Sequence, residues 1–341
     1  MGKRKLSRQQ AWRVEKIQAE RASRAAKRDA TAQELLQEGE LGPEREGLVV
    51  AHYGTQVAVE CEPGDSVRCH LRANLEGLVT GDRVIWCPGE PTGVVVAQLP
   101  RSSALSRPDS QGKLRPVAAN IDQILIIIAP YPQPHANLID RYLVAAHATG
   151  IEPIIVLNKR DLLEQDAALS TQMSELLAIY PSLGYRVIMT SAKGTVSSML
   201  LSALEHKTSV FVGQSGVGKS SLVNALVPEA DIRTAALSQT TRKGTHTTTT
   251  ARLIHLGCGG ALIDSPGIRE FGLWHLSREE VEAGFSELRA LLGTCKFRDC
   301  RHQQEPGCAV LAAVEAGGIA PQRLDSYRHI VAGFEGEETP G

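Results

Sequence analysis

A phosphate-binding motif limits the possible folds of this 341-residue chain more strongly than any other feature of its sequence. The motif is GQSGVGKS, residues 213–220, which matches G-x-x-x-x-G-K-[ST] in full. It follows the apolar run TSVFV and opens the run SSLVNAL, so it lies between a strand and a helix, as this motif requires. Its glycines allow backbone N–H groups to surround a phosphate, and the helix start adds partial positive charge. The sequence therefore predicts an α/β domain that binds a nucleoside triphosphate.

The phosphate site is expected to use the whole loop and the first residues of the helix. These residues are Gly213, Gln214, Ser215, Gly216, Val217, Gly218, Lys219, Ser220 and Ser221. Lys219 is expected to reach the β- and γ-phosphates and to act in catalysis there, and Ser220 is expected to ligate Mg²⁺.

A second motif indicates which base the nucleotide carries. The run IIVLNKRDLL places Asn158, Lys159 and Asp161 directly after an apolar strand. A carboxylate such as Asp161 can accept hydrogen bonds from both N1–H and the exocyclic amine of guanine, whereas adenine offers no such pair of donors. Asn158 is expected to hold the base and the strand geometry, and the stem of Lys159 to pack along the ring. The pattern favours GTP over ATP, so a P-loop kinase that uses ATP is disfavoured.

The segment TSAK, residues 190–193, follows the next apolar strand and is expected to complete the base site. The backbone N–H of Ala192 can donate to guanine O6, and Ser191 and Lys193 flank it. These base motifs precede the phosphate loop, whereas ordinary GTPases have the reverse order. If the two halves keep their places in the sheet while the chain ends move, one nucleotide can still meet both. The GTPase domain is therefore predicted to be circularly permuted.

Two polar segments after the phosphate loop resemble the switch regions of GTPases. In TTRKGTHTTTT, residues 240–250, Thr247 or Thr248 could ligate Mg²⁺, with Thr248 preferred; a polar surface loop is the alternative. In LIDSPGI, Asp264 ends a strand and is expected to hold Mg²⁺ through water, while the N–H of Gly267 can contact the γ-phosphate.

The residue that would orient the attacking water is missing from its usual place. Many GTPases carry Gln directly after the D-x-x-G motif, but here the position is Ile268, which cannot form a hydrogen bond. Unassisted hydrolysis is expected to be slow. His246 is the obvious polar substitute, able to align water or to accept its proton, although an exposed loop histidine without a catalytic role is also possible.

A cluster of metal-ligating residue types follows in CKFRDCRHQQEPGC. Its three thiols and one imidazole, from Cys295, Cys300, His302 and Cys308, would fill a tetrahedral Zn²⁺ site and leave no open position. That pattern indicates a structural metal, and a disulfide plus a spare thiol is the alternative. The flanks, 277–293 and 308–333, are predicted to be helical. Four arginines here could meet RNA or simply face solvent: Arg298, Arg301, Arg323 and Arg328.

The rest of the chain divides by composition. Residues 1–46 form a basic, helix-prone arm, either a solvated tail or an RNA-binding arm, with a membrane-surface helix less favoured. Residues 47–105 contain short β-rich runs and are predicted to form an OB-type β-barrel, a common oligonucleotide scaffold. A linker, 101–116, leads into the GTPase domain, 106–274, whose strands alternate with helices as in a mostly parallel sheet. A zinc-binding helical domain and tail occupy 275–341.

Composition and hydrophobic patterning indicate the cellular compartment of the protein. The sequence has a formal net charge of -1 and seven cysteines, and no stretch reaches the ~18 apolar residues needed to cross a bilayer. The N-terminus lacks the apolar region of a secretory signal. A cytoplasmic protein with no membrane partner is therefore expected.

Taken together, the motifs are similar to those of the circularly permuted, ribosome small-subunit-dependent GTPase A family (RsgA/YjeQ). The similarity extends from about Gly47 to Gly333 through AANIDQILII, NKRD, TSAK, GQSGVGKSSL, KGTHTTT, DSPGIREFGL and the metal-ligand spacing. It implies a multidomain α/β protein with an OB barrel, a permuted GTPase domain and a zinc domain. It also implies GTP hydrolysis stimulated by the small ribosomal subunit and its rRNA during late maturation, with catalysis by the histidine at position 246. The protein is expected to act as a monomer. The alternative is a GTP-regulated RNA-binding scaffold with little turnover.

Overall fold

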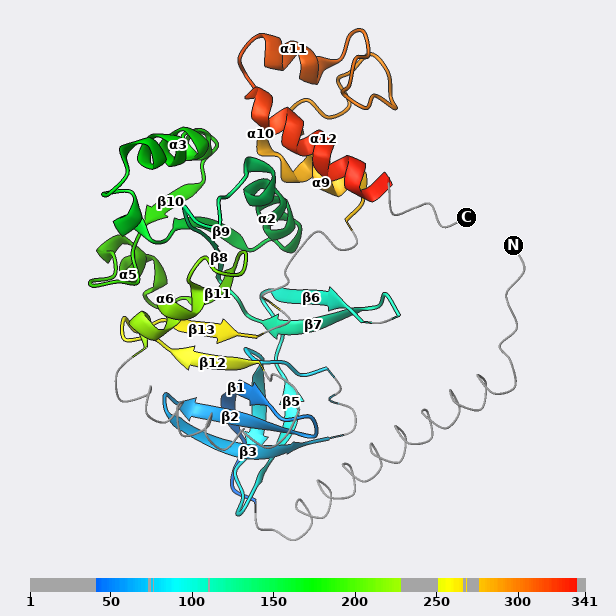
Figure 1. The fold of residues 1–341 in the computed structure, drawn as a ribbon. Helices are drawn as coiled ribbons and strands as arrows, with labels where there is room; N and C mark the ends of the chain where they lie inside the picture. The colour runs from blue at the N-terminus through cyan, green and yellow to red at the C-terminus, as the bar shows by residue number, and fades with distance from the viewer. Residues whose placement is uncertain are drawn as a thin grey trace, which may run out of the picture. The chain divides into compact units, whose positions relative to one another are not determined.

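The computed structural model describes residues 41–72, 75, 77–109, 111–227, 251–265, 268 and 276–335. The chain divides into two compact units, Met1–Arg101 and Ser102–Gly341, and each is described by itself. Figure 1 shows the elements of both units along the chain. None of the helices in these described ranges has the length and apolar character that spanning a bilayer would require.

The first unit is a closed five-stranded barrel. Its strands are β1 (Arg45–His52), β2 (Gln56–Glu62), β3 (Asp65–Leu71), β4 (Arg83–Cys87) and β5 (Gly93–Gln98). Strand β1 pairs with both β2 and β4, and β5 closes the circuit between β3 and β4. Alternate residues point inward, so Val49, Val57, Val84 and Val95 are fully buried. The predicted OB-type barrel is confirmed.

The predicted linker at the start of the second unit is wrong. Most of residues 101–116 belong to an antiparallel hairpin of β6 (Ala104–Pro108) and β7 (Leu114–Ala119), seen beside the sheet in Figure 1. Asp109 Oδ1 accepts the backbone N–H groups of Gln111 and Lys113, which shapes the turn. The hairpin is not evident from the sequence, because Pro, Gly and Ser interrupt the alternation of apolar and polar residues that indicates strands, as they do in loops.

The second unit contains a mostly parallel sheet, as predicted. Its strands are β8 (Gln123–Ile128), β9 (Glu152–Leu157), β10 (Arg186–Met189), β11 (Thr208–Val212), β12 (Arg252–His255) and β13 (Ala261–Asp264). They lie in the order β10-β9-β8-β11-β13-β12, and only β12 is antiparallel to its neighbour in this set. All six residues of β8 are buried, which explains the apolar run that follows Gln123 in this strand.

Helices cover both faces of this sheet. One face carries α2 (Ala136–Thr149) and α3 (Ala167–Leu177), whose Leu143 and Met173 share a core with Ile126 of β8. The other face carries α5 (Ser198–Leu204) and α6 (Lys219–Leu226). Two short helical turns, η1 (Arg160–Leu162) and α4 (Ile179–Ser182), lie in the connections. The two-sided cover is the predicted α/β arrangement.

The C-terminal region is helical as predicted, and each predicted flank contains two helices. They are α9 (Arg278–Gly284), α10 (Ser286–Arg289), α11 (Ala309–Glu315) and α12 (Pro321–Glu335). The side chains of Ser277 and Glu280 form a capping box that starts α9. Phe285 and Tyr327 belong to the same core as α2, so these helices pack on one face of the GTPase domain.

Candidate nucleotide site and metal centre

The nucleotide motifs lie where an α/β sheet normally binds its ligand. The chain moves outward from β8 to β9 and β10, then returns to β11 on the other side of β8. Ligands bind at the carboxyl ends of the strands beside such a reversal. The phosphate loop follows β11, Asn158 follows β9, and the segment 190–193 follows β10. Three motifs that are far apart in the sequence therefore share one edge of the sheet.

Two glycines fix the path of the phosphate loop. Gly213 has φ of 137° and Gly218 has φ of 94°, in the left-handed region that favours glycine. A Cβ at Gly213 would collide with the carbonyl oxygen of Ile127, and a Cβ at Gly218 would collide with the amide of Asn158. The loop is thus held between the neighbouring strand β8 and the base motif.

The base motif contacts the phosphate loop directly. Asn158 is fully buried, and its Nδ2 donates to the carbonyl oxygen of Val217 at 2.9 Å. Lys159 Nζ donates to the carbonyl oxygen of Gly216 at 2.7 Å and to that of Tyr131 at 2.8 Å. The two halves that the sequence presents in reversed order therefore meet, and the distance between their motifs along the chain is no obstacle to one nucleotide.

Asp161 presents an ionised carboxylate beside the segment 190–193. Its Oδ1 accepts a hydrogen bond from Ser191 Oγ at 2.7 Å, and Lys193 Nζ lies 3.4 Å from its Oδ2. The hydrogen bond from Ser191, followed by the interaction with Lys193, lowers the pKa of Asp161 below its usual value. A carboxylate that stays charged is the acceptor that the two donors of guanine require.

An open cavity of about 280 Å³ adjoins this carboxylate. Its lining includes Asp161, Ser191 and Lys193, which the sequence indicates, and also Glu164, Thr195 and Ser197, which it does not. Thr190 connects the two base segments, because its carbonyl oxygen accepts the N–H of Arg160 and its Oγ1 accepts the N–H of Ser197. Thr190 is the first residue of the segment TSAK, and this position was the available signal for its role. Ala192 is partly buried between Ser191 and Lys193.

The phosphate end carries the expected cation. Lys219 is the first residue of α6, and its Nζ donates to the carbonyl oxygens of Gly213 and Gln214 at 2.6 Å each. Ser220 and Ser221 are exposed on the first turn of the same helix. Asp264 ends β13, which runs parallel to β11, so this carboxylate lies on a strand next to the one that leads into the phosphate loop.

Three expected catalytic or metal-binding residues, His246, Thr248 and Gly267, lie outside the described residues. Ile268, which occupies the usual place of a water-orienting Gln, is buried with 1% of its surface exposed. Its side chain belongs to the core that also contains Phe285, where it packs rather than faces solvent.

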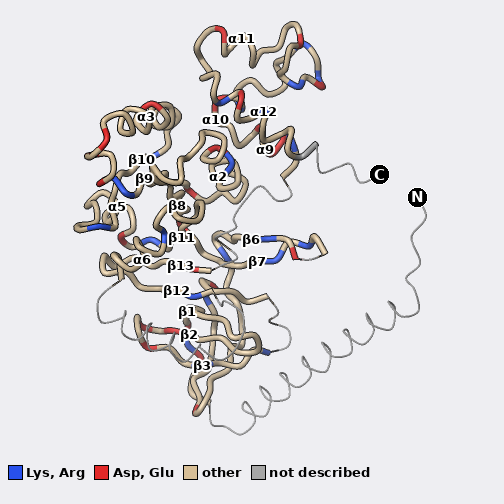
Figure 2. The backbone as a smooth tube through the Cα atoms, in the orientation of Figure 1, with Lys and Arg blue, Asp and Glu red and all other residues tan. Residues whose placement is uncertain are grey.

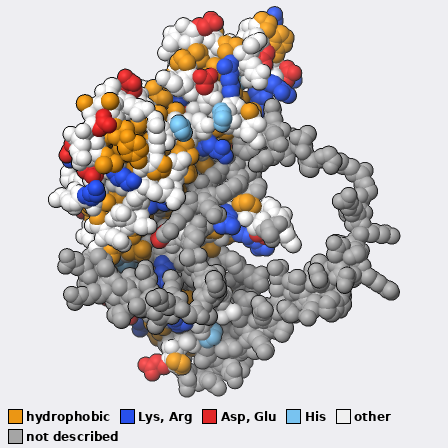
Figure 3. Space-filling model, viewed as in Figure 1, with side chains coloured by type: hydrophobic (Ala, Val, Ile, Leu, Met, Phe, Trp, Pro, Cys, Tyr) orange, Lys and Arg blue, Asp and Glu red, His pale blue; other side chains and the backbone are white. Residues whose placement is uncertain are grey.

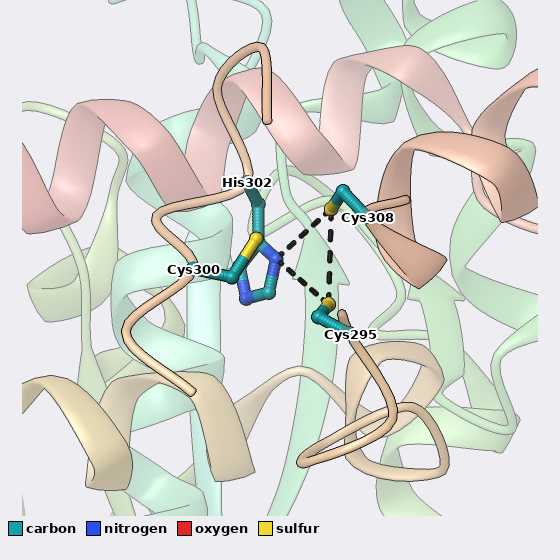
Figure 4. Close-up of side chains that lie close together, drawn as sticks. All are labelled: Cys295, Cys300, His302 and Cys308. Carbon is teal, nitrogen blue, oxygen red and sulfur yellow. Dashed lines mark hydrogen bonds between the residues drawn. The ribbon is translucent and has the colours of Figure 1, made fainter. Parts of the chain in front are cut away.

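The predicted metal ligands come together in one cluster. The ligand atoms of Cys295, Cys300, His302 and Cys308 all lie within 4.8 Å of one another. In Figure 4 the imidazole Nδ1 of His302 faces two sulfurs, at 3.3 Å from that of Cys308 and 3.7 Å from that of Cys295. All three thiols are free, so the alternative of a disulfide is not formed. Three thiols and one imidazole suit a tetrahedral metal ion such as Zn²⁺.

The surroundings of the cluster also suit a metal. Glu282 Oε1 lies 3.7 Å from His302 Nε2, the position of a carboxylate that fixes the ring of a metal-bound histidine. Burial raises the pKa of the Cys295 thiol, but hydrogen bonds from the N–H groups of Ala309 and Val310 lower it overall. Burial raises the pKa of Cys300 to about 12, and a positive ion would favour its thiolate.

One expectation for the arginines of this region is wrong. Arg323 does not face RNA or solvent: it is 1% exposed and pairs with Asp140 and Glu287. Arg328 is partly buried, and its guanidinium donates to the carbonyl oxygen of His302. Arg298 and Arg301 are exposed, as expected for arginines that meet solvent or a partner.

Comparison with known proteins agrees with this geometry. Residues 98–274 match the model of the family described as RsgA GTPase. The protein named small ribosomal subunit biogenesis GTPase RsgA from Azotobacter vinelandii (strain DJ / ATCC BAA-1303) is 60% identical over 338 residues, which cover 97% of this chain and 98% of that protein. The protein of the same name from Pseudomonas aeruginosa PAO1 is 60% identical over 334 residues, with the same two coverages.

Two solved structures are similar along most of the chain. The structure of YjeQ from Thermotoga maritima has a TM-score of 0.68 and 33% identity, covering 87% of this chain and 100% of that one. The structure of YloQ, described as a circularly permuted GTPase, has a TM-score of 0.67 and 30% identity, covering 88% of this chain and 98% of that one. The closed barrel, the permuted order of the nucleotide motifs and these similarities lead to one conclusion: the chain belongs to the RsgA family of circularly permuted GTPases.

Proposed function

We propose that this GTPase is a cytoplasmic, monomeric factor for late maturation of the small ribosomal subunit, and that the subunit stimulates its GTP hydrolysis. Support comes from the names of the relatives, small ribosomal subunit biogenesis GTPase, at 60% identity over almost the whole chain. The observation that carries the nucleotide chemistry is the contact of Asn158 and Lys159 with the carbonyl oxygens of the phosphate loop.

The proposed nucleotide site binds one GTP across the edge of the sheet. Asp161 accepts N1–H and the exocyclic amine of guanine, and Ala192 donates to O6. Backbone N–H groups of residues 213–218 and the Lys219 ammonium hold the phosphates. Ser220 and Thr248 would ligate Mg²⁺, with Asp264 holding it through water; the ion would supply charge that neutralises the phosphates.

His246 is the proposed group that aligns the attacking water, with the N–H of Gly267 at the γ-phosphate. Ile268 supports the assignment of water alignment to His246, because the Ile268 side chain is buried and has no polar atom with which to orient water. Catalysis would then depend on a partner that positions the loop around His246. A GTPase that is slow alone and fast on its partner suits an assembly factor that must release only at the right site.

The metal cluster is proposed to hold one structural Zn²⁺ through Cys295, Cys300, His302 and Cys308. These four ligands leave no open position for substrate, so the ion would stabilise the loop instead of reacting. The barrel and this C-terminal region would dock on rRNA in the GTP state, and hydrolysis would weaken that docking.

GTP hydrolysis with and without purified small subunits tests the proposal. We expect multiple turnover that the subunit accelerates, and loss of this acceleration in His246→Ala with GTP binding retained. Large subunits are the control for nonspecific RNA. Absence of stimulation by small subunits would contradict the ribosomal role, and retained binding with no turnover in either protein would favour a GTP-regulated scaffold. Competition by ATP against labelled GTP tests base selectivity, and effective competition would refute the role of Asp161.

A further inference from the structure

Three arginines line one shallow notch in the C-terminal region. Arg278 comes from α9, Arg301 from the loop that carries the metal ligands, and Arg328 from α12. Gln303 and Tyr327 complete its polar lining. No carboxylate lines the notch, although acidic residues lie on neighbouring elements. Residues 278, 301 and 328 are far apart in the sequence, so folding is required to assemble this group of positive charges.

Arg328 is held in place by uncharged acceptors. Its Nε and Nη2 donate to the carbonyl oxygen of His302 at 3.0 and 2.6 Å, and Nη2 also donates to that of Gln303 at 2.9 Å. The carboxylate of Asp325 is 3.8 Å from Nη1, and its side chain is 76% exposed, so water screens this pair. The guanidinium is therefore fixed in position while most of its charge stays available to a ligand.

Arg278 is fixed from the other side of the notch. Its Nε donates to Glu282 at 3.0 Å, and its Nη2 donates to the carbonyl oxygen of Cys300 and to Tyr327 Oη at 3.1 Å each. Glu282 offsets part of the charge of Arg278. The hydrogen bonds found for Arg278 thus use its Nε and Nη2, and among the residues that the structure describes none is found for Nη1.

Arg301 adds an exposed cation on the metal-bearing loop. The carboxylate of the nearby Glu305 accepts backbone N–H groups of Arg301, Gln303 and Gln304 at 2.7 to 3.0 Å. Glu305 thus stabilises the loop turn and is not among the residues that line the notch. The charge that faces a ligand in the notch comes from arginine.

The chemistry of the notch fits a phosphate group. A guanidinium offers parallel N–H donors that match two oxygens of a phosphate, and side chains already held in position lose little entropy on binding. The notch is shallow and open, which suits a phosphate carried by a polymer better than an enclosed small molecule. Figure 2 marks the positions of Lys and Arg along the backbone of this helical region, and Figure 3 shows Lys and Arg side chains on its surface.

We propose that Arg278, Arg301 and Arg328 form a binding site for a backbone phosphate of small-subunit rRNA. This inference rests on the proposed ribosomal function and assigns part of its docking surface. The metal site and the notch share His302. Its backbone has φ of 57°, and its ring lies among the cysteines. Its carbonyl oxygen accepts a hydrogen bond from Arg328 in the notch. An ion at the four ligands would therefore hold the acceptors that position Arg328.

Binding of the full chain to purified small subunits, measured with a non-hydrolysable GTP analogue at several salt concentrations, tests this site. Loss of one phosphate contact removes roughly 0.9 from the slope of log affinity against log salt, or roughly fivefold in affinity near 0.15 M salt. We expect this loss in Arg328→Gln and in Arg301→Gln. Arg328→Lys keeps the charge but not the paired donors, so we expect it to retain the salt slope with intermediate affinity.

Arg289→Gln is the matched control, because Arg289 is exposed on α10 of the same region and does not line the notch. We expect wild-type affinity and salt slope in this variant. In Arg328→Gln we expect an unchanged metal content, which would show that the four-residue cluster is intact. Equal losses in Arg289→Gln and Arg328→Gln would overturn the site and leave only a general charge effect. Cross-linking from position 301 to a ribosomal protein instead of rRNA would also overturn it. If the wild type does not bind small subunits, the proposed function itself fails.

Discussion

Arg323 Nη1 lies 2.5 Å from Asp140 Oδ1, and the two side chains are 1% and 0% exposed. This buried ion pair joins α12 of the C-terminal region to α2 of the GTPase domain. Glu287 of α10 accepts from the same guanidinium, and Tyr180 Oη donates to Asp140 at 2.9 Å. Burial disfavours the charged form of Arg323, but the hydrogen bond with Glu287 and the charge of Asp140 raise its pKa overall, so it stays protonated.

Removal of this guanidinium should destabilise the second unit. Arg323→Met leaves Asp140 and Glu287 buried without their cation, which costs about 3–5 kcal/mol in comparable pairs. Denaturant unfolding followed by circular dichroism measures the change, and Arg289→Met on exposed α10 is the control. The triple variant with Asp140→Asn and Glu287→Gln should recover much of the loss, since no unpaired charge remains. Additive losses instead of recovery would show that the ion network is not the cause.

The burial of Arg323 could not be predicted from the sequence alone. Arginine is rarely fully buried, so its residue type indicated a surface position. Its spacing gave a weak opposite signal: positions 323, 327 and 330 repeat at i, i+4 and i+7, the stripe by which α12 packs against the core. The partner Asp140 is 183 residues away along the chain. Only the packing of α12 on α2 reveals that the pair is buried.

The strand, loop and helix of the phosphate-loop motif were more predictable, because their geometry is local. The strand, loop and helix around Lys219 have a length and glycine pattern that define a phosphate loop before any tertiary contact forms. The contact of Asn158 with Val217 also required the two halves of the domain to keep their places in one sheet, as the permuted motif order predicted. The hairpin at 104–119 was not predicted, because its stability comes from the burial of Leu105 and Ala118 and not from a strong local pattern.

Asp161→Asn should change which base the site prefers. The amide loses one of the two acceptors for guanine, so GDP affinity should fall about 100-fold or more. Xanthine carries a carbonyl where guanine has its amine, and Asn can donate to that oxygen while accepting N1–H. Fluorescent nucleotide titrations should therefore show a gain for xanthosine diphosphate. Equal losses for both nucleotides would argue that Asp161 only stabilises the loop.

Ser191→Ala should raise the pH below which protonation of Asp161 abolishes guanine binding, which is called here the acid limit of binding. The hydrogen bond from Ser191 lowers the pKa of Asp161, so the wild-type carboxylate is protonated only below its ordinary value of 3.8. Binding that requires the ionised form is thus present above that range and is lost as pH falls through it. We expect GDP affinity of the wild type to be flat between about pH 7.5 and 5. Ser197→Ala, in the same cavity, is the control, and the same acid limit in both variants would refute the role of Ser191.

Gly218→Ala should disturb the junction between the two motifs. Its φ of 94° is strained for alanine, and the added Cβ would meet the Asn158 amide that donates to Val217. Strain alone costs about 1–3 kcal/mol, and the clash adds to it, so nucleotide affinity should fall at least about tenfold. Gly184→Ala separates the two effects, because Gly184 has φ of 87° and open space around the added Cβ. Wild-type nucleotide affinity in Gly218→Ala would contradict the proposed junction.

Cys308→Ser should release the metal and loosen the helices around it. Cys308 supplies a sulfur to the four-residue cluster, and the same Sγ accepts the backbone N–H of Leu311 at the start of α11. Metal analysis of the purified chain should fall from one zinc per molecule to well below one, and protease should cut the region around α11 faster. Cys61→Ser is the control, since Cys61 is exposed in the barrel and outside the cluster. Because none of the metal ligands lines the cavity beside Asp161, GDP affinity should change little in either variant. Full zinc retention in Cys308→Ser would rule this cysteine out as a ligand.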